Sequence, residues 1–148
     1  MATIERHVTR ELVGLDAGTP CSGAAQLMKE ANIGSVAVRE NGRVVGIVTE
    51  RDLVTRVLAD GEAASLPIRD AMRTDLPTVA PSASDAECTA LMRDHATRHL
   101  LVVEGGEVVG IISMRDVIRL MLDEKEWLIG QLQTFIKGHD GPRSIAAT

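Results

Sequence analysis

The chain has 148 residues, of which 45% are hydrophobic and 25% are charged, a composition typical of a water-soluble globular protein with one core. The formal net charge of −5 argues against a surface that binds the nucleic-acid backbone, because such surfaces need clustered Lys and Arg. No apolar run approaches the roughly 18 residues of a membrane span, and the first residues lack the apolar stretch of a signal peptide. We therefore expect a cytoplasmic protein whose partners include neither nucleic acid nor a membrane.

The two cysteines, Cys21 and Cys88, have neither the spacing of a metal site nor that of a redox pair. We expect Cys88 to pack as a small apolar residue on a helix and Cys21 to lie in a loop, with a disulfide or metal role as the less favoured alternative. Because the chain has no Tyr, one Phe and one Trp, its core must be aliphatic.

The chain contains an internal duplication. A shift of 64 residues aligns Ile4–Leu58 with Ile68–Leu122 without a gap, and 14 of the 55 aligned pairs are identical. Composition alone would produce about three identities over this length. The identities include the glycines Gly46 and Gly110, which fit a position where something approaches the strand backbone closely or which mark only a bulge.

The first unit, residues 4–60, begins with a short helical turn and a brief extended piece. An amphipathic helix follows, and then a hairpin around Asn41-Gly42, a two-residue turn signal. A second helix starts at Glu50 and ends near Asp60-Gly61. In chain order, the predicted segments are Ile4–Val8, Leu12–Leu15, Ser22–Ala31, Ser35–Glu40 and Arg43–Thr49.

Residues 61–67 read as a linker, and residues 68–122 repeat the same order of elements around a second turn at Gly105-Gly106. We therefore predict an α/β (α+β) fold of two β-α-β-β-α repeats, packed sheet to sheet with pseudo-twofold symmetry. Each repeat is too small to be stable as a separate domain, and the apolar face of its hairpin must be covered by another element. The predicted segments are Ile68–Met72, Thr78–Val79, Ser84–His95, His99–Glu104, Glu107–Ser113 and a helix from Met114.

The last helix is predicted to continue beyond the repeat through residues 123–137, before Gly138, with residues 138–148 disordered. Leu128, Leu132, Phe135 and Ile136 share one face of this extension, and Trp127 lies beside it. This face either packs back on its own domain or meets a partner helix. We favour a homodimer to which the helix contributes.

Each repeat carries a hydroxyl residue and an aspartate three positions apart where a strand enters a helix: Thr49 with Asp52, and Ser113 with Asp116. This is a helix-capping pattern, which accounts for both positions structurally. The same junction also presents free backbone N–H groups to an anion, and the carboxylate suits the vicinal hydroxyls of a ribose. Arg51 or Arg115 could then reach a phosphate.

The stretches NIGSVAVRENGRVVGIVTERDL and TRHLLVVEGGEVVGIISMRDV resemble a tandem pair of CBS domains, the module named after cystathionine β-synthase, over residues 4–122. The resemblance implies a regulatory module without catalysis. It also implies an adenosine-containing ligand, such as AMP, ADP, ATP or another adenosyl compound, in the cleft between the repeats. Because residues 4–122 make up most of the chain, any signal would pass through an effector protein or an altered dimer.

The resemblance implies roles for particular residues. It implies that Asp52 and Asp116 accept ribose hydroxyls, that Thr49 and Ser113 lie beside them, and that Arg51, Arg115 and His99 hold phosphate, with Ser35 as the counterpart of His99. Leu12–Asp16 departs from the family pattern, so the second site is the one we favour if only one binds. Adenine is expected beside Val13, Thr78, Val36 and Leu100.

Two other functions fit parts of the sequence. A nucleotide hydrolase could use Asp94, His95 and His99 for catalysis, but the sequence shows no nucleophile with an adjacent base. A purely structural dimerisation or interaction protein would use its Thr49–Asp52 and Ser113–Asp116 pairs only as caps.

Overall fold

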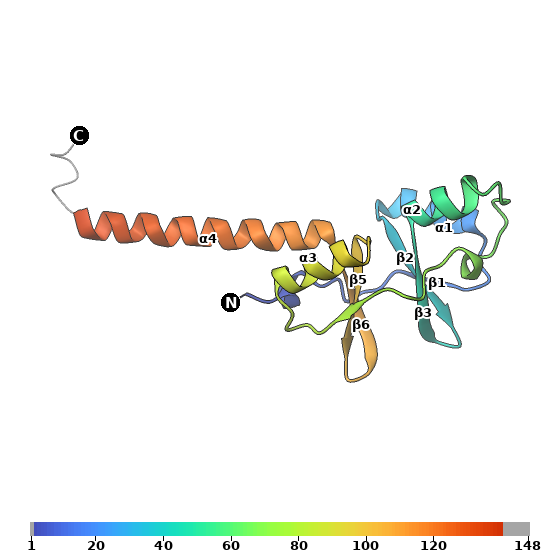
Figure 1. Ribbon diagram of the computed structural model, residues 1–148, viewed down its shortest axis with the longest axis horizontal. Helices are drawn as coiled ribbons and strands as arrows, with labels where there is room; N and C mark the ends of the chain where they lie inside the picture. The colour runs from blue at the N-terminus through green and yellow to red at the C-terminus, as the bar shows by residue number, and fades with distance from the viewer. Residues whose placement is uncertain (1, 141–148) are drawn as a thin grey trace.

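A computed structural model describes residues 2–140, and these form two repeats of the same architecture followed by a long helix (Figure 1). Each repeat has a three-stranded sheet with helices at one end. The first repeat contains β1 (Gly14–Asp16), α1 (Cys21–Ala31), β2 (Ser35–Glu40), β3 (Arg43–Thr49) and α2 (Glu50–Asp52). The second contains β4 (Thr78–Val79), α3 (Asp85–Asp94), β5 (His99–Glu104), β6 (Glu107–Ser113) and α4 (Met114–Asp140). Single 3₁₀ turns, Ile4–His7 and Ile68–Asp70, precede the two repeats. The predicted fold class is confirmed.

The two sheets have the same topology. In each, a short parallel strand pairs with the first hairpin strand, which pairs in antiparallel fashion with the second. Both hairpin turns have positive φ at both central residues, 51° and 77° at Asn41 and Gly42, and 62° and 79° at Gly105 and Gly106. Asn-Gly and Gly-Gly tolerate this backbone, so the hairpins begin and end at the predicted residues.

The repeats exchange their leading turns. Ile4, at the start of the first repeat, is fully buried in the core of the second, which also contains Leu100 and Ile112. Ile68, at the start of the second repeat, is buried in the core of the first, with Val36. Each core therefore depends on a residue from the other half of the sequence, and this ties the halves together.

Backbone pairing continues this exchange at the edge of each sheet. Thr9 exchanges two hydrogen bonds of 3.0 Å with Ile111 of β6, and Arg73 exchanges two with Ile47 of β3. At these crossings a Cβ on Gly46 would lie 2.8 Å from the Arg73 carbonyl oxygen, and one on Gly110 would lie 2.7 Å from the Thr9 carbonyl oxygen. The close approach predicted at the two glycines is thus made by the chain itself, which explains why no side chain fits there.

The helices that follow the hairpins differ from each other and from the prediction. In the first repeat, α2 is helical only to Asp52 and continues as a π-helix over Leu53–Leu58, where the Ala59 N–H bonds to the Val54 carbonyl. In the second repeat, α4 runs past Gly138 to Asp140. A glycine costs about 1 kcal/mol in a helix interior but does not forbid helix, so it does not stop α4. The remaining residues of the predicted disordered tail, 141–148, lie outside the described part.

Helix α4 projects away from the body (Figure 1). Its base packs on α3 and on the first turn, where His7 Nε2 lies 3.0 Å from Asp123 Oδ2. Every described side chain from Lys125 to Lys137 is exposed, so the extension does not pack back on its own domain. Across residues 2–140, no helix combines the length and apolarity needed to cross a membrane.

Candidate functional site

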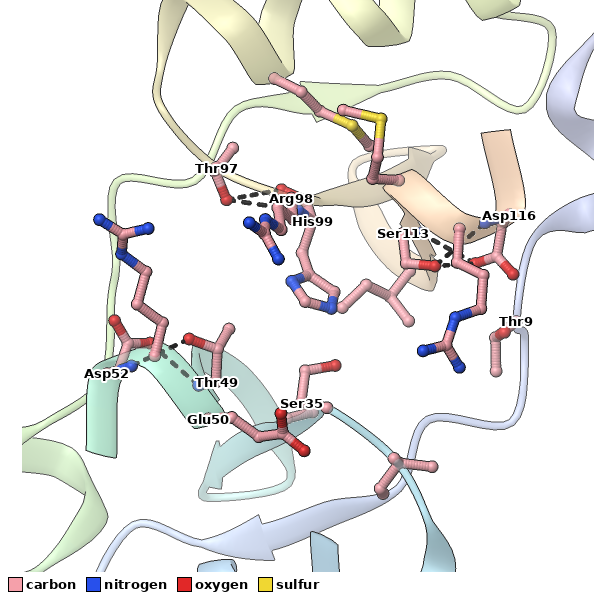
Figure 2. A pocket seen from close by; sticks show the side chains of 18 of the residues that line it. Thr9, Ser35, Thr49, Glu50, Asp52, Thr97, Arg98, His99, Ser113 and Asp116 are labelled. Carbon is pink, nitrogen blue, oxygen red and sulfur yellow. Dashed lines mark hydrogen bonds between the residues drawn. The ribbon is translucent and has the colours of Figure 1, made fainter. Parts of the chain in front are cut away.

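A cleft of about 960 Å³ lies between the two repeats, and both contribute to its walls. Figure 2 shows the Thr49–Asp52 pair on one side, the Ser113–Asp116 pair on the other, and His99 between them. The strand ends that carry these pairs face the cleft because each hairpin's second strand runs directly into a helix at the same end of its sheet.

The first pair forms a reciprocal helix cap. The Thr49 N–H donates to Asp52 Oδ2 at 2.9 Å, and the Asp52 N–H donates to the Thr49 hydroxyl at 3.1 Å. Asp52 is 5% exposed, and its Oδ1 lies 3.9 Å from Arg56 Nε, too far for a hydrogen bond. The cap therefore uses one carboxylate oxygen and leaves the other available.

The second pair repeats this cap with one additional bond. Asp116 Oδ2 accepts the Ser113 N–H at 2.9 Å and the Ser113 hydroxyl at 2.8 Å, while the Asp116 N–H lies 3.2 Å from Ser113 Oγ. Within residues 2–140, Asp116 Oδ1 accepts no hydrogen bond. Both carboxylates are thus fixed in direction by their caps, and each keeps an oxygen that can accept a hydroxyl.

The cleft is richer in positive charge than the chain as a whole. The chain has 16 Lys and Arg against 21 Asp and Glu, but the cleft is lined by six arginines and four carboxylates: Arg51, Arg73, Arg93, Arg98, Arg115 and Arg119 against Glu11, Glu50, Asp52 and Asp116. Arg73 Nε is buried without a hydrogen bond, and its ion pair with Asp75 Oδ1 is long, at 3.7 Å. Such a wall favours an anion.

His99 lies among charges of both signs. Burial lowers the pKa of His99 below its ordinary value, and Arg98 acts in the same direction, while the carboxylates of Asp116, Asp52 and Glu50 raise it. Carboxylates from both repeats therefore act on the imidazole, which lies between the Thr49–Asp52 and Ser113–Asp116 pairs in Figure 2. Lowered pKa favours the neutral ring near neutral pH.

The structure brings nine of the twelve predicted site residues to the cleft wall: Thr49, Arg51, Asp52, Ser113, Arg115, Asp116, His99, Ser35 and Val13. Val36 and Leu100 are instead 1% and 0% exposed and belong to the two cores. Side chains alternate along a strand, so Ser35 and Ala37 face the cleft while Val36 faces the core. Thr78 is exposed on β4, outside the cleft lining.

Several lining residues were missed in the sequence. Arg73 and Thr9 occupy equivalent positions in the two repeats, and their backbones make the crossings described above. Arg98 is the counterpart of Gly34, and Glu50 is the counterpart of Met114. The shift of 64 residues reveals these substitutions, but only the folded chain reveals that all of them face one cavity.

Both cysteines are buried and free. Burial, with the nearby carboxylates of Glu87 and Asp85, raises the pKa of Cys88 to about 11, and burial with Asp70 raises that of Cys21. Cys21 is the first residue of α1 rather than part of a loop. Within the described residues, no group of three or more His, Cys, Asp or Glu side chains is arranged to hold a metal ion.

The duplicated topology, with its two capped aspartates opening into one cleft, is that of a CBS-domain pair. The CBS domain family matches at residues 4–59 and 68–123, and the chain belongs to this family. Tandem CBS domains are in general regulatory, nucleotide-binding modules without catalytic activity of their own.

Relatives of similar size share this organisation. The chain is similar to the CBS domain-containing protein YhcV of Bacillus subtilis, with 30% identity over 117 residues, 79% of this chain and 84% of the relative. A CBS-domain-containing protein from Agrobacterium tumefaciens superposes with a TM-score of 0.74 at 30% identity, over 81% of this chain and 99% of that one. Hypoxic Response Protein I, solved with two coordinated zinc ions, has a TM-score of 0.67 at 26% identity, over 80% and 98%.

Proposed function

We propose that this protein is a regulatory module that binds an adenosine-containing nucleotide in the cleft between its CBS repeats. The observation that carries the proposal is the pair of cap-oriented carboxylates, each with an oxygen left over, at the two ends of one arginine-lined cavity. A carboxylate oxygen in this setting accepts hydrogen bonds from the hydroxyls of a ribose, and the arginines donate hydrogen bonds to the phosphate oxygens.

The phosphates are assigned to the side of the second repeat. There Arg98 and His99 take the places of Gly34 and Ser35, so basic side chains stand where the first repeat has small ones. Glu50, which would repel a phosphate, is on the side of the first repeat. If a single nucleotide binds, we therefore expect Asp116, Ser113 and Arg115 to organise its site.

Ligand binding would be transmitted by a change in a dimer of the module or by an effector protein that contacts it. A ligand that bridges both walls binds best when the repeats are at one particular spacing, so it biases the population toward that arrangement. Ile4 and Ile68 are each buried in the core of the other repeat, so a change in the spacing between the repeats also acts on both cores.

The test is isothermal titration of the purified, nucleotide-stripped protein with AMP, ADP, ATP, NAD and S-adenosylmethionine. A saturable ligand whose affinity falls in Asp116→Ala, and also in Asp52→Ala if both sites fill, supports the proposal. Binding that is unaffected by both substitutions would place the ligand elsewhere, and turnover of the bound nucleotide that disappears in His99→Ala would indicate an enzyme instead.

A second candidate function follows from the caps themselves. Because both Asp52 and Asp116 cap helices, a purely structural interaction protein would need no ligand to explain them. The conservative substitution Asp116→Glu separates the two functions. A longer acid still caps a helix but moves the spare oxygen by about one carbon–carbon bond, so nucleotide affinity falls while stability is kept.

A further inference from the structure

The helices that follow the two hairpins place different residues next to their capping aspartates. The residue four positions after Asp52 is Arg56, and its equivalent in the second repeat is Leu120. Leu120 is 3% exposed and belongs to the core of the second repeat. A regular α-helix in the first repeat would therefore direct Arg56 into a hydrophobic core, where an unpaired charge is costly.

The π-helix of the first repeat avoids this burial. In Leu53–Leu58, backbone hydrogen bonds reach five residues back instead of four. The wider turn places Val57, 5% exposed, in the core in place of Arg56. The Arg56 side chain is instead 44% exposed and lies beside Asp52. Short π-helical turns of this kind are rare and occur frequently at functional sites.

The Arg56 side chain is held between Asp52 and the segment that crosses the first sheet. Its Nη1 donates a hydrogen bond of 2.9 Å to the Met72 carbonyl, and its Nε lies 3.9 Å from Asp52 Oδ1, the oxygen that the helix cap leaves over. Met72 precedes Arg73, whose backbone pairs with Ile47 of β3, so the hydrogen bond anchors the guanidinium to the sheet. Arg56 itself does not line the cleft, so it acts on a ligand only through Asp52.

We infer that Arg56 is a positioning residue that weakens the first ribose site and leaves the second as the stronger one. A ribose hydroxyl that takes the spare oxygen of Asp52 competes with the attraction of that oxygen to the guanidinium. Within residues 2–140, the spare oxygen of Asp116 has no such cation, because Leu120 stands in place of the arginine. The inference rests on the proposed nucleotide function and assigns the inequality of its two sites to one side chain.

The test is isothermal titration of the full chain in the Asp116→Ala background, which leaves Asp52 as the ribose acceptor. The probes are ATP and AMP, each compared with its 2′-deoxy counterpart. The ratio of the two affinities reports the ribose contact, so a change of stability alone does not alter it. Arg56→Leu, which introduces the residue of the second repeat, should raise both the ribonucleotide affinity and this ratio about fivefold, the upper end for a half-exposed ion pair. Arg56→Gln, which removes the charge but keeps an amide donor, should act in the same direction.

The matched control is Arg69→Leu. Arg69 is 47% exposed, and its Nη2 lies 3.9 Å from Glu40 Oε1, so it resembles Arg56 in exposure and in the length of its ion pair. It belongs to a segment outside the cleft lining. Its replacement removes the same charge and should leave both the affinity and the ratio unchanged.

Three results would overturn the inference. They are a ratio that does not rise in the two Arg56 variants, an equal rise in Arg69→Leu, and an absence of binding in Asp116→Ala both with and without Arg56→Leu. Failure of the proposed function is a different result, in which the wild-type protein binds no nucleotide or keeps its full affinity in both Asp52→Ala and Asp116→Ala. The inference would then fall together with the proposed function.

Discussion

Replacing Asp116 with alanine separates the two roles of its carboxylate, since one oxygen caps α4 and the other is proposed to accept ribose hydroxyls. Loss of the cap bonds from Ser113, 2.9 and 2.8 Å long, should lower the free energy of unfolding by about 1 kcal/mol. For a chain of this size, that corresponds to about 2–4 °C in melting temperature. Loss of two hydrogen bonds to a charged acceptor should cost a further ~3 kcal/mol in ligand binding, or about 100-fold in affinity.

The matched control is Ser84→Ala. The Ser84 hydroxyl caps α3 by accepting the Glu87 N–H at 3.1 Å, and Ser84 does not line the cleft. Its loss should lower the melting temperature by a similar amount and leave affinity unchanged. Thermal unfolding and isothermal titration on the same preparations measure both quantities. Equal affinities for Asp116→Ala and Ser84→Ala would refute the assignment of a ligand oxygen to Asp116.

Three further outcomes are expected from the structure. Burial lowers the pKa of His99, and a bound phosphate favours its protonated form, so nucleotide affinity should rise as the pH falls below about 6.5, and His99→Gln should flatten this profile in titrations at several pH values. In the free protein, the lowered pKa means that the free energy of unfolding decreases as the pH falls below the pKa of the unfolded state. A free energy of unfolding that does not decrease there would contradict the burial of the ring. Gly110→Ala should destabilise by about 1–3 kcal/mol in denaturant unfolding, since its Cβ meets the Thr9 carbonyl at 2.7 Å, whereas Gly130→Ala, with open space around it, should stabilise by up to ~1 kcal/mol. Ile4→Ala should cost about 2–5 kcal/mol despite its place near the terminus, and a loss below 1 kcal/mol would show that its burial in the second core contributes little.

Local sequence patterns determined the elements of this protein. The Asn41-Gly42 and Gly105-Gly106 turns require positive φ, and alternating apolar residues on either side leave little freedom in hairpin register. The hydroxyl–aspartate pairs likewise cap their helices through residues only three positions apart, so Asp52 and Asp116 were identifiable before any fold was known. These features depend on interactions between near neighbours in the chain.

Tertiary structure decided which faces meet. Val36 and Leu100 were expected at the cleft, but their side chains point into the two hydrophobic cores. Side chains alternate along a strand, and each sheet buries the side that its helices cover. The sequence contains no local signal that Ile4 and Ile68 cross to the opposite core, or that Arg73 and Arg98 face the same cavity as Arg115. These placements arise from packing between segments distant in the chain, such as Ile4 with Leu100, 96 residues apart, and Ile68 with Val36, 32 residues apart, where burial of apolar surface in both repeats outweighs any preference of a single segment.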